Sequence, residues 1–290
     1  MTMTEATTRT LKVPGAILTY DVRTGGSGDE PALFLIGSPM GAAGFGSLAG
    51  HFADRTIVTY DPRGSERSTK PDMTSESIPD EHGDDLHRII QEVGRAVDMF
   101  ASSGGAVNAL ALVAKHPEDV RTLVAHEPPL ASVLPDSDNA KAAARAISAS
   151  YQRGGFPAGM AHFIAVVSHR GQFPDDFAQQ PPPDPAMFGM PAEDDDSRTD
   201  PLLGQNIITC THYEPDFNAL RAASTRIVMA AGEGSEGEMA NRGAHAVAER
   251  LGTAPVSFPS DHGGFLGGEY GQTGEPEAFA AKLRQVLEGS

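Results

Sequence analysis

The chain has 290 residues, which suits one large domain or a domain with an insertion. Its formal net charge of −17 argues against binding to nucleic acid or to an anionic membrane, because both need clustered Lys and Arg. The single Cys210 excludes an intramolecular disulfide. Neither an apolar run of about 18 residues nor an apolar core in the polar N-terminus is apparent, so we expect no membrane span, no secretion signal and a cytoplasmic location.

The first sixty residues indicate strands with one short helix among them. We expect, in chain order, a hairpin over residues 10–22, a strand over 32–36, a helix over 45–52 and a strand over 56–60. Pro14-Gly15 supplies the turn between the two alternating strands of the hairpin. Residues 32–36 are wholly apolar, which is typical of a parallel strand covered on both faces.

The next segment adds strands and helices separated by polar loops. We expect a turn-rich loop over 61–68, an exposed loop over 70–83, a helix over 84–93, a strand over 96–101, a helix that ends near His116-Pro117 and a strand over 120–126. The acidic pair Asp84-Asp85 marks the start of the first of these helices.

The character of the sequence changes after residue 129. An Ala-rich helix over 139–151, an apolar helix over 160–167 and a Pro/Asp-rich stretch over 179–201 are expected there. We interpret residues 130–205 as an insertion of helices and long loops. It divides a core domain into a first part, 1–129, and a second part, 206–290.

The strand pattern then resumes and completes an α/β fold. We expect a strand over 226–231, a helix over 238–251, a strand over 255–258, a loop over 259–265 and a helix over 276–287. Strands that alternate with helices predict a mostly parallel, doubly wound sheet with helices on both faces. Active sites in such sheets lie outside the carboxyl ends of the strands, so the loops after the strands are where chemistry is expected.

A serine sits at the turn between the strand over 96–101 and the helix that follows. At a sharp strand-to-helix turn the hydroxyl is lifted off the sheet and lies beside the free N–H groups of the helix. Small residues two positions before and after the serine let strand and helix approach, and Ala101 and Gly105 meet that need around Ser103. For Ser102 the first of these positions would be the bulky Phe100, so Ser103 is the predicted nucleophile.

Four loops after strands carry motifs that resemble those of the α/β-hydrolases. The nucleophile elbow resembles residues 101–105, with Ala101 where Gly is commoner, and the Asp-x-Arg-Gly-x-Gly-x-Ser loop resembles residues 61–68, with Glu66 for the second Gly. The His-Gly-x-Pro turn resembles residues 36–39 without the His, and the terminal histidine loop resembles residues 261–265. The resemblance covers nearly the whole chain and implies an α/β-hydrolase core whose insertion is a cap over the pocket.

The resemblance implies a triad in the order nucleophile, acid, histidine. His262 follows the last predicted strand in a Gly-rich loop, and it is the predicted general base and acid. In many relatives the acid follows the strand equivalent to 226–231, where this chain has Ser235. In others the acid follows the strand after the nucleophile helix, and here that strand ends at Glu127.

We therefore assign Glu127 as the acid, with Glu236 as the second candidate and Glu233 as the third. A carboxylate is needed to hold the imidazole in the correct tautomer and to stabilise its cation. His126 precedes Glu127 directly, and strand alternation predicts that it faces away from the site. The histidines on polar or helical stretches, His87 and His116 among them, are expected to have no chemical role.

The remaining site residues follow from the same loops. The backbone N–H groups of Ser38 and Gly104 are the expected oxyanion hole. Substrate contacts are expected from Met40, Met187, Phe188 and Phe265, whereas Phe163 is expected in the core of the insertion. Asp61 and Arg63 are expected to hold loop structure.

These residues predict a serine hydrolase that cleaves a small or medium apolar ester, thioester or lactone through an acyl-enzyme. The alternatives are a C–C hydrolase or a natural-product cyclase or lyase on the same fold, or a ligand-binding member without catalysis. No dinucleotide, P-loop or metal-ligand spacing is apparent, so we expect no cofactor and no metal. The expected partner is a small-molecule substrate, and the chain is expected to be a monomer or a homodimer.

Overall fold

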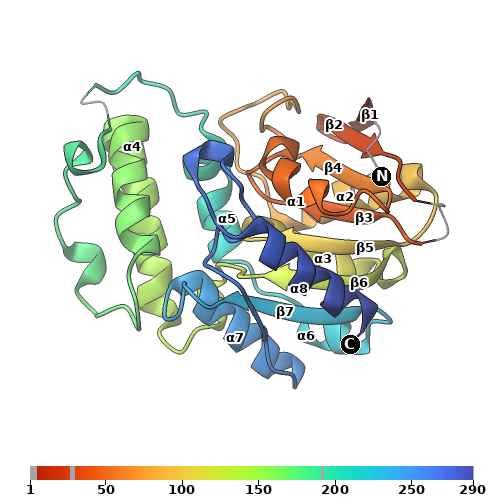
Figure 1. Ribbon diagram of the computed structural model, residues 1–290. Helices are drawn as coiled ribbons and strands as arrows, with labels where there is room; N and C mark the ends of the chain where they lie inside the picture. Colours follow the sequence, from red (N-terminus) through yellow and green to blue (C-terminus); the bar gives the residue numbers. More distant parts are fainter. Residues whose placement is uncertain (1–4, 27–29, 191–192, 290) are drawn as a thin grey trace.

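The computed structural model describes residues 5–26, 30–190 and 193–289 (Figure 1). Its strands are β1 (Thr7–Val13), β2 (Ala16–Arg23), β3 (Leu33–Ile36), β4 (Ile57–Asp61), β5 (Val97–Ser102), β6 (Val120–His126), β7 (Arg226–Gly232) and β8 (Val256–Phe258). They form one eight-stranded sheet in the order β1-β2-β4-β3-β5-β6-β7-β8. β1 and β2 pair antiparallel with each other and β2 pairs antiparallel with β4, while the pairs from β4 to β8 are parallel.

Helices cover both faces of this sheet. They are α1 (Gly46–Gly50), α2 (Pro79–Val93), α3 (Gly104–Lys115), α4 (Ser137–Val167), α5 (Ile207–Thr211), α6 (Phe217–Ala222), α7 (Met239–Leu251) and α8 (Pro276–Glu288). Side chains of α2, α3, α6 and α7 share one apolar core with the sheet, and side chains of α1 and α8 share another. The predicted mostly parallel, doubly wound α/β fold is therefore confirmed.

The strand β3 shows why its sequence is apolar throughout. Phe34 and Ile36 belong to the core beneath α2 and α3, whereas Leu33 and Leu35 belong to the core beneath α1 and α8. Successive side chains of a strand point to opposite faces, so a strand covered on both faces needs an apolar residue at every position.

Several helices differ from the sequence prediction. Helix α2 begins at Pro79 within the expected loop, because Pro79 takes the first helical position and the Glu81 carboxylate accepts a hydrogen bond from the Ile78 N–H at 3.2 Å. Helix α6 was not predicted; the Asp216 carboxylate caps it by accepting hydrogen bonds from the next helical N–H groups. The expected helix over 45–52 is a 3₁₀ turn, Ala42–Phe45, followed by the short α1.

Residues 130–205 contribute no strand to the sheet among the positions that the structure describes. The two helices expected there are one element, α4, whose path is broken at Gly154 and Gly155, just before Pro157. Apolar side chains of α4 pack with α5 and with Leu203 to form a third core. Figure 1 shows α4 set apart from the sheet, with α5 between them.

The expected Pro/Asp-rich stretch over 179–201 includes residues 191–192, which lie outside the described residues. Its described part contains the 3₁₀ turn Pro185–Phe188 and otherwise irregular backbone. Among the described residues, no helix combines the length and the apolar composition that crossing a bilayer would require.

Candidate active site

Ser103 occupies a tight turn between β5 and α3. Its backbone has φ of 57°, a conformation that is unusual for a residue with a side chain, and its N–H donates to the His126 carbonyl at 2.9 Å. The adjacent glycines are required by close approach, because a Cβ on Gly104 would lie 2.4 Å from the Ser38 carbonyl oxygen. A Cβ on Gly105 would lie 2.8 Å from the Cα of Gly37. The turn is thus pressed against the loop after β3, whereas the sequence predicted only a close approach between β5 and α3.

Glu127 follows β6, the strand next to that of Ser103, and it is fully buried. Its Oε1 accepts hydrogen bonds from the Gly232 N–H at 2.8 Å, from the Asn241 side-chain amide at 3.0 Å and from the Ser235 hydroxyl. Its own backbone has φ of 48°. This carboxylate is held by donors from the end of β7 and from α7, so its orientation is fixed.

The second carboxylate oxygen of Glu127 faces His262. Oε2 lies 2.7 Å from the Nδ1 of His262, which fixes the imidazole by one ring nitrogen. Burial would raise the pKa of Glu127, but the hydrogen bond from His262 and the charges of His126 and His262 outweigh it and lower the pKa to about 2. Burial likewise opposes the charged form of His262, yet the Glu127 partner prevails and raises the pKa of the imidazole.

The other two candidate carboxylates lie elsewhere. Glu236 is exposed, and so is Glu233, whose carboxylate accepts a hydrogen bond from the Ser257 hydroxyl at 3.0 Å. Ser235, which stands where many relatives carry the acid, instead donates its hydroxyl to Glu127. The structure therefore brings Glu127, and neither of the alternatives, into contact with His262.

A cavity of about 290 Å³ opens in front of Ser103 and His262. Its walls are mostly apolar, and the residues that line it are Ser38, Ser103, Gly104, Pro129, Ala144, Ile147, Phe163, Val166, Val167, Leu202, Asn206, Ile207, Cys210, Thr211, Glu238, Met239, Ala240, His262 and Gln272. Much of this wall comes from α4 and from the segment that leads into α5. Ser38 and Gly104, whose N–H groups are the predicted oxyanion hole, meet at the same wall as Ser103.

The structure places the four predicted substrate contacts outside the lining of this cavity, which corrects that prediction. Met187 is 76% exposed and Phe188 lies on the same 3₁₀ turn. Phe265 is buried and stacks on Phe45, with ring centroids 5.5 Å apart. Met40 packs against the core beneath α1 and α8. All four are large apolar residues near predicted loops. A large apolar side chain can line a pocket, pack in a core or lie on an exposed turn, and the sequence does not distinguish these positions.

The apolar wall contains residues that sequence reasoning missed. Phe163 lines the cavity and also packs against the core of the insertion, where it was expected. Ala144 and Ile147 lie three positions apart on α4, and Val166 and Val167 lie further along it. Their helical spacing was visible in the sequence, but it marks a buried face without telling what that face covers.

His126 lies closer to the site than the alternation of side chains along β6 predicted. Its ring centroid is 5.9 Å from that of His262, and among the described residues neither ring nitrogen has a hydrogen-bond partner. Burial is the main cause that lowers its pKa, to about 4. His126 shares a face of β6 with Val124, and the loop that carries His262 and Phe265 crosses that same face.

The loop after β4 holds structure, as predicted. The Asp61 carboxylate accepts from the Ala42 N–H at 2.8 Å and from the Arg67 Nε at 2.5 Å. Arg63 makes two hydrogen bonds of 2.8 Å to the buried Asp85 carboxylate on α2. A paired guanidinium and carboxylate of this kind tie this loop to α2.

The fold recurs in known proteins. The family model for the alpha/beta hydrolase fold matches residues 31–160. The chain is 30% identical to the uncharacterized hydrolase YraK of Bacillus subtilis, over 96% of this chain and 95% of that one. An esterase from Exiguobacterium antarcticum superposes with a TM-score of 0.68 at 18% identity, covering 96% of this chain and 97% of that chain. A thermophilic esterase from Thermogutta terrifontis gives 0.65 at 18% identity, covering 98% of each chain.

The identity to YraK extends over almost the full length of both chains, and the elbow, the sheet order and the His262 loop are those expected of the fold. The protein therefore belongs to the α/β-hydrolase family and is a hydrolase.

Proposed function

We propose that the protein is a serine hydrolase that cleaves carboxylic esters, thioesters or lactones with a small or medium apolar acyl group. The observation that carries this proposal is the contact between Glu127 and His262 at 2.7 Å, beside a mostly apolar cavity that Ser103 and His262 both line. In the proposed assignment residues 130–205 act as a cap, since α4 supplies much of the apolar wall.

In the proposed reaction, neutral His262 accepts the proton of the Ser103 hydroxyl as the Oγ attacks the substrate carbonyl carbon. The N–H groups of Gly104 and Ser38 donate to the resulting oxyanion. His262 then gives its proton to the leaving atom, which is oxygen in an ester or lactone and sulfur in a thioester. An acyl-Ser103 ester remains. A water molecule, deprotonated by His262, then attacks the acyl carbon, and His262 returns the proton to the Ser103 Oγ as the acyl–oxygen bond breaks and the carboxylic acid leaves.

Glu127 has two tasks in this scheme. It accepts the hydrogen bond from Nδ1, which leaves Nε2 of His262 as the nitrogen that takes the proton. It also stabilises the imidazolium that forms, and its lowered pKa keeps it ionised at neutral pH. The three donors on its other oxygen hold it in place without neutralising it.

The test is labelling with a fluorophosphonate, read by intact mass and peptide mapping. We expect rapid modification of Ser103, none in Ser103→Ala, and unchanged labelling in the matched control Ser102→Ala, which alters a buried residue of β5. Labelling should slow sharply in Glu127→Gln and stay unchanged in Glu236→Gln. A panel of esters, thioesters and lactones of increasing acyl length then defines the substrate class.

Two results would contradict the proposal. An unlabelled wild-type protein would exclude an activated serine and favour a ligand-binding member or a different reaction on this fold. Labelling at the wild-type rate in Glu127→Gln would remove Glu127 from the mechanism.

A further inference from the structure

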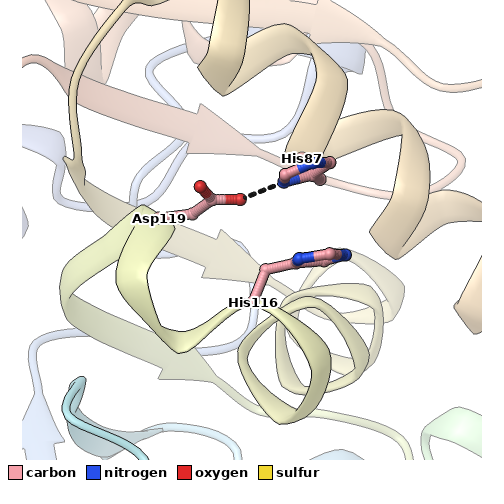
Figure 2. A group of neighbouring side chains, drawn as sticks. All are labelled: His87, His116 and Asp119. Atoms are coloured by element: carbon pink, nitrogen blue, oxygen red, sulfur yellow. Dashed lines mark hydrogen bonds and ion pairs between the residues drawn. The ribbon is translucent and has the colours of Figure 1, made fainter.

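A second group of imidazole and carboxylate side chains lies at the opposite end of β6 from Glu127. It consists of His87 on α2, His116 directly after α3 and Asp119 in the turn that enters β6, and we call it the His87 cluster (Figure 2). One potential ligand atom from each residue lies within 4.8 Å of the other two. Two backbone segments of the core, α2 and the connection from α3 to β6, therefore converge on one point.

Asp119 is the fixed member of the His87 cluster. Its side chain is only 3% exposed, and both carboxylate oxygens have partners. Oδ2 lies 2.6 Å from Nδ1 of His87, and Oδ1 accepts from the Gln91 side-chain amide at 3.0 Å. A carboxylate with one oxygen oriented by a neighbouring amide, and the other beside an imidazole, resembles the supported ligands found at metal centres.

The two histidines are packed face to face at the surface. Their ring centroids are 3.8 Å apart with an interplanar angle of 14°, and each side chain is 28% exposed. The remaining ionic neighbour of His116 is the exposed carboxylate of Glu118, at 3.7 Å from Nδ1. Two imidazoles are thus gathered within reach of a single buried carboxylate, at a place open enough for an ion to enter.

We propose that His87, His116 and Asp119 bind one Zn²⁺ ion, with water in the fourth position. Two imidazoles and a carboxylate suit zinc, whereas Mg²⁺ and Ca²⁺ prefer sites made of oxygen ligands. The ion replaces the proton between Nδ1 of His87 and Asp119, and that proton passes to solvent.

Binding needs only a local adjustment. Zinc bonds of about 2.0–2.1 Å bring tetrahedral ligand atoms to roughly 3.4 Å from one another, so the cluster contracts slightly. The His116 ring turns out of the stack, because an imidazole binds a metal in its own plane, and its partial exposure leaves room for that turn. The bound ion joins α2 to the turn between α3 and β6.

This site is independent of the proposed reaction. Asp119 and Glu127 flank the seven residues of β6, so at roughly 3.3 Å per residue the His87 cluster lies roughly 25 Å from Glu127, at the other end of the strand. Loss of zinc binding and loss of serine labelling can therefore be observed separately.

The test is equilibrium dialysis of the tag-free full chain against ZnCl₂, with metal content read by mass spectrometry, and visible absorption with Co²⁺ as a second probe. We expect one Zn²⁺ per wild-type chain and a rise in Tm on adding zinc. His87→Gln and His116→Gln should each weaken binding by at least roughly tenfold and abolish the rise in Tm. His245→Gln, which removes an exposed histidine on α7, is the matched control and should bind as the wild type does.

A further variant separates the two possible sites on this chain. His126, Glu127 and His262 also bring ligand atoms within 4.8 Å of one another, so His262→Gln is measured in parallel. Zinc binding that survives in His262→Gln and fails in the two His87 cluster variants supports the proposal. Binding that fails only in His262→Gln, binding that neither cluster variant weakens, or no binding by the wild type would overturn it. If His87→Gln does not fold, as read by circular dichroism, His116→Gln decides.

Discussion

Two imidazoles and one carboxylate gather at each end of strand β6, and the two groups differ in burial and in surroundings. At its carboxyl end Glu127 is fully buried, receives three hydrogen bonds on one oxygen, and holds His262 beside an apolar cavity. At its amino end Asp119 is also buried, but its imidazoles stack at the surface. The same functional groups therefore favour different chemistry, because only the carboxyl end of a parallel strand opens beside the loops that build a pocket.

The sharpest test of this comparison is Glu127→Gln. The amide keeps the shape but removes the charge that stabilises a protonated His262, so kcat/KM for an ester should fall roughly 10³–10⁴-fold. Steady-state kinetics on the best ester of the panel measures it, with the exposed Glu236→Gln as the control. A loss of kcat/KM below tenfold would contradict the assignment of Glu127 as the acid. It would also remove the proposed chemical difference between the two ends of β6.

A second test concerns His126, which is buried without a hydrogen-bond partner for either nitrogen among the described residues. Its pKa is lowered from 6.5 to about 4. Between these two pH values the unfolded chain binds a proton on His126 and the folded protein does not. Stability from this group is present above pH 6.5 and falls as the pH drops towards 4, by about 2 kcal/mol between pH 7 and pH 5.

His126→Leu removes that dependence, so its free energy of unfolding should fall less than that of the wild type over the same range. Urea denaturation at pH 7 and at pH 5 measures the difference. Equal losses in the two proteins would show that His126 is not the group responsible. His116→Leu, which alters the half-exposed imidazole at the other end of β6, is the comparison variant.

A smaller effect is expected from Ser235→Ala. The variant removes one of three donors to Oε1 of Glu127 and leaves the Gly232 N–H and the Asn241 amide in place. We expect kcat/KM to fall roughly tenfold, the size expected for one hydrogen bond to a charged group. Ser257→Ala, which removes a hydroxyl bound to the exposed Glu233, serves as the control. An equal effect of both substitutions would argue against a role through Glu127.

The smallest effect is a shift in the pH profile. A base must be neutral to accept a proton, and Glu127 raises the pKa of His262, so activity should fall on the acid side at a higher pH than an ordinary imidazole would give. Glu127→Gln removes that partner and should move the acid limb of kcat/KM to lower pH, in addition to lowering the rate. An acid limb that stays in place would show that another group controls it.

Local sequence predicted most of the sheet and the centre of the site. The apolar run of β3 reflects its burial on both faces, and the small residues around Ser103 mark a turn that the backbone of the loop after β3 approaches closely. The position of Glu127 directly after β6 placed it at the edge of the sheet where His262 also lies. The contact between Glu127 and His262 then favours Glu127 over Glu236 and Glu233 as the acid.

The cavity wall could not be predicted in the same way. Met187 and Phe188 of the insertion are the predicted contacts, but the part of the wall that the insertion supplies includes Ile147 and Phe163 of α4. The pattern of an amphipathic helix tells which face is apolar, and the break at Gly154 and Gly155 changes the direction of the chain in a way that spacing does not encode.

By itself, the sequence determined the doubly wound architecture, the sharp serine turn and the order of the chemical groups along the chain, because each is visible in local patterns of apolar and small residues. Only the tertiary structure decided which carboxylate meets His262, which residues line the cavity, that His126 is buried beside the site, and that His87 and His116 converge on Asp119. These are contacts between segments far apart in sequence. Their geometry follows from how helices pack on the two faces and at the two edges of one sheet.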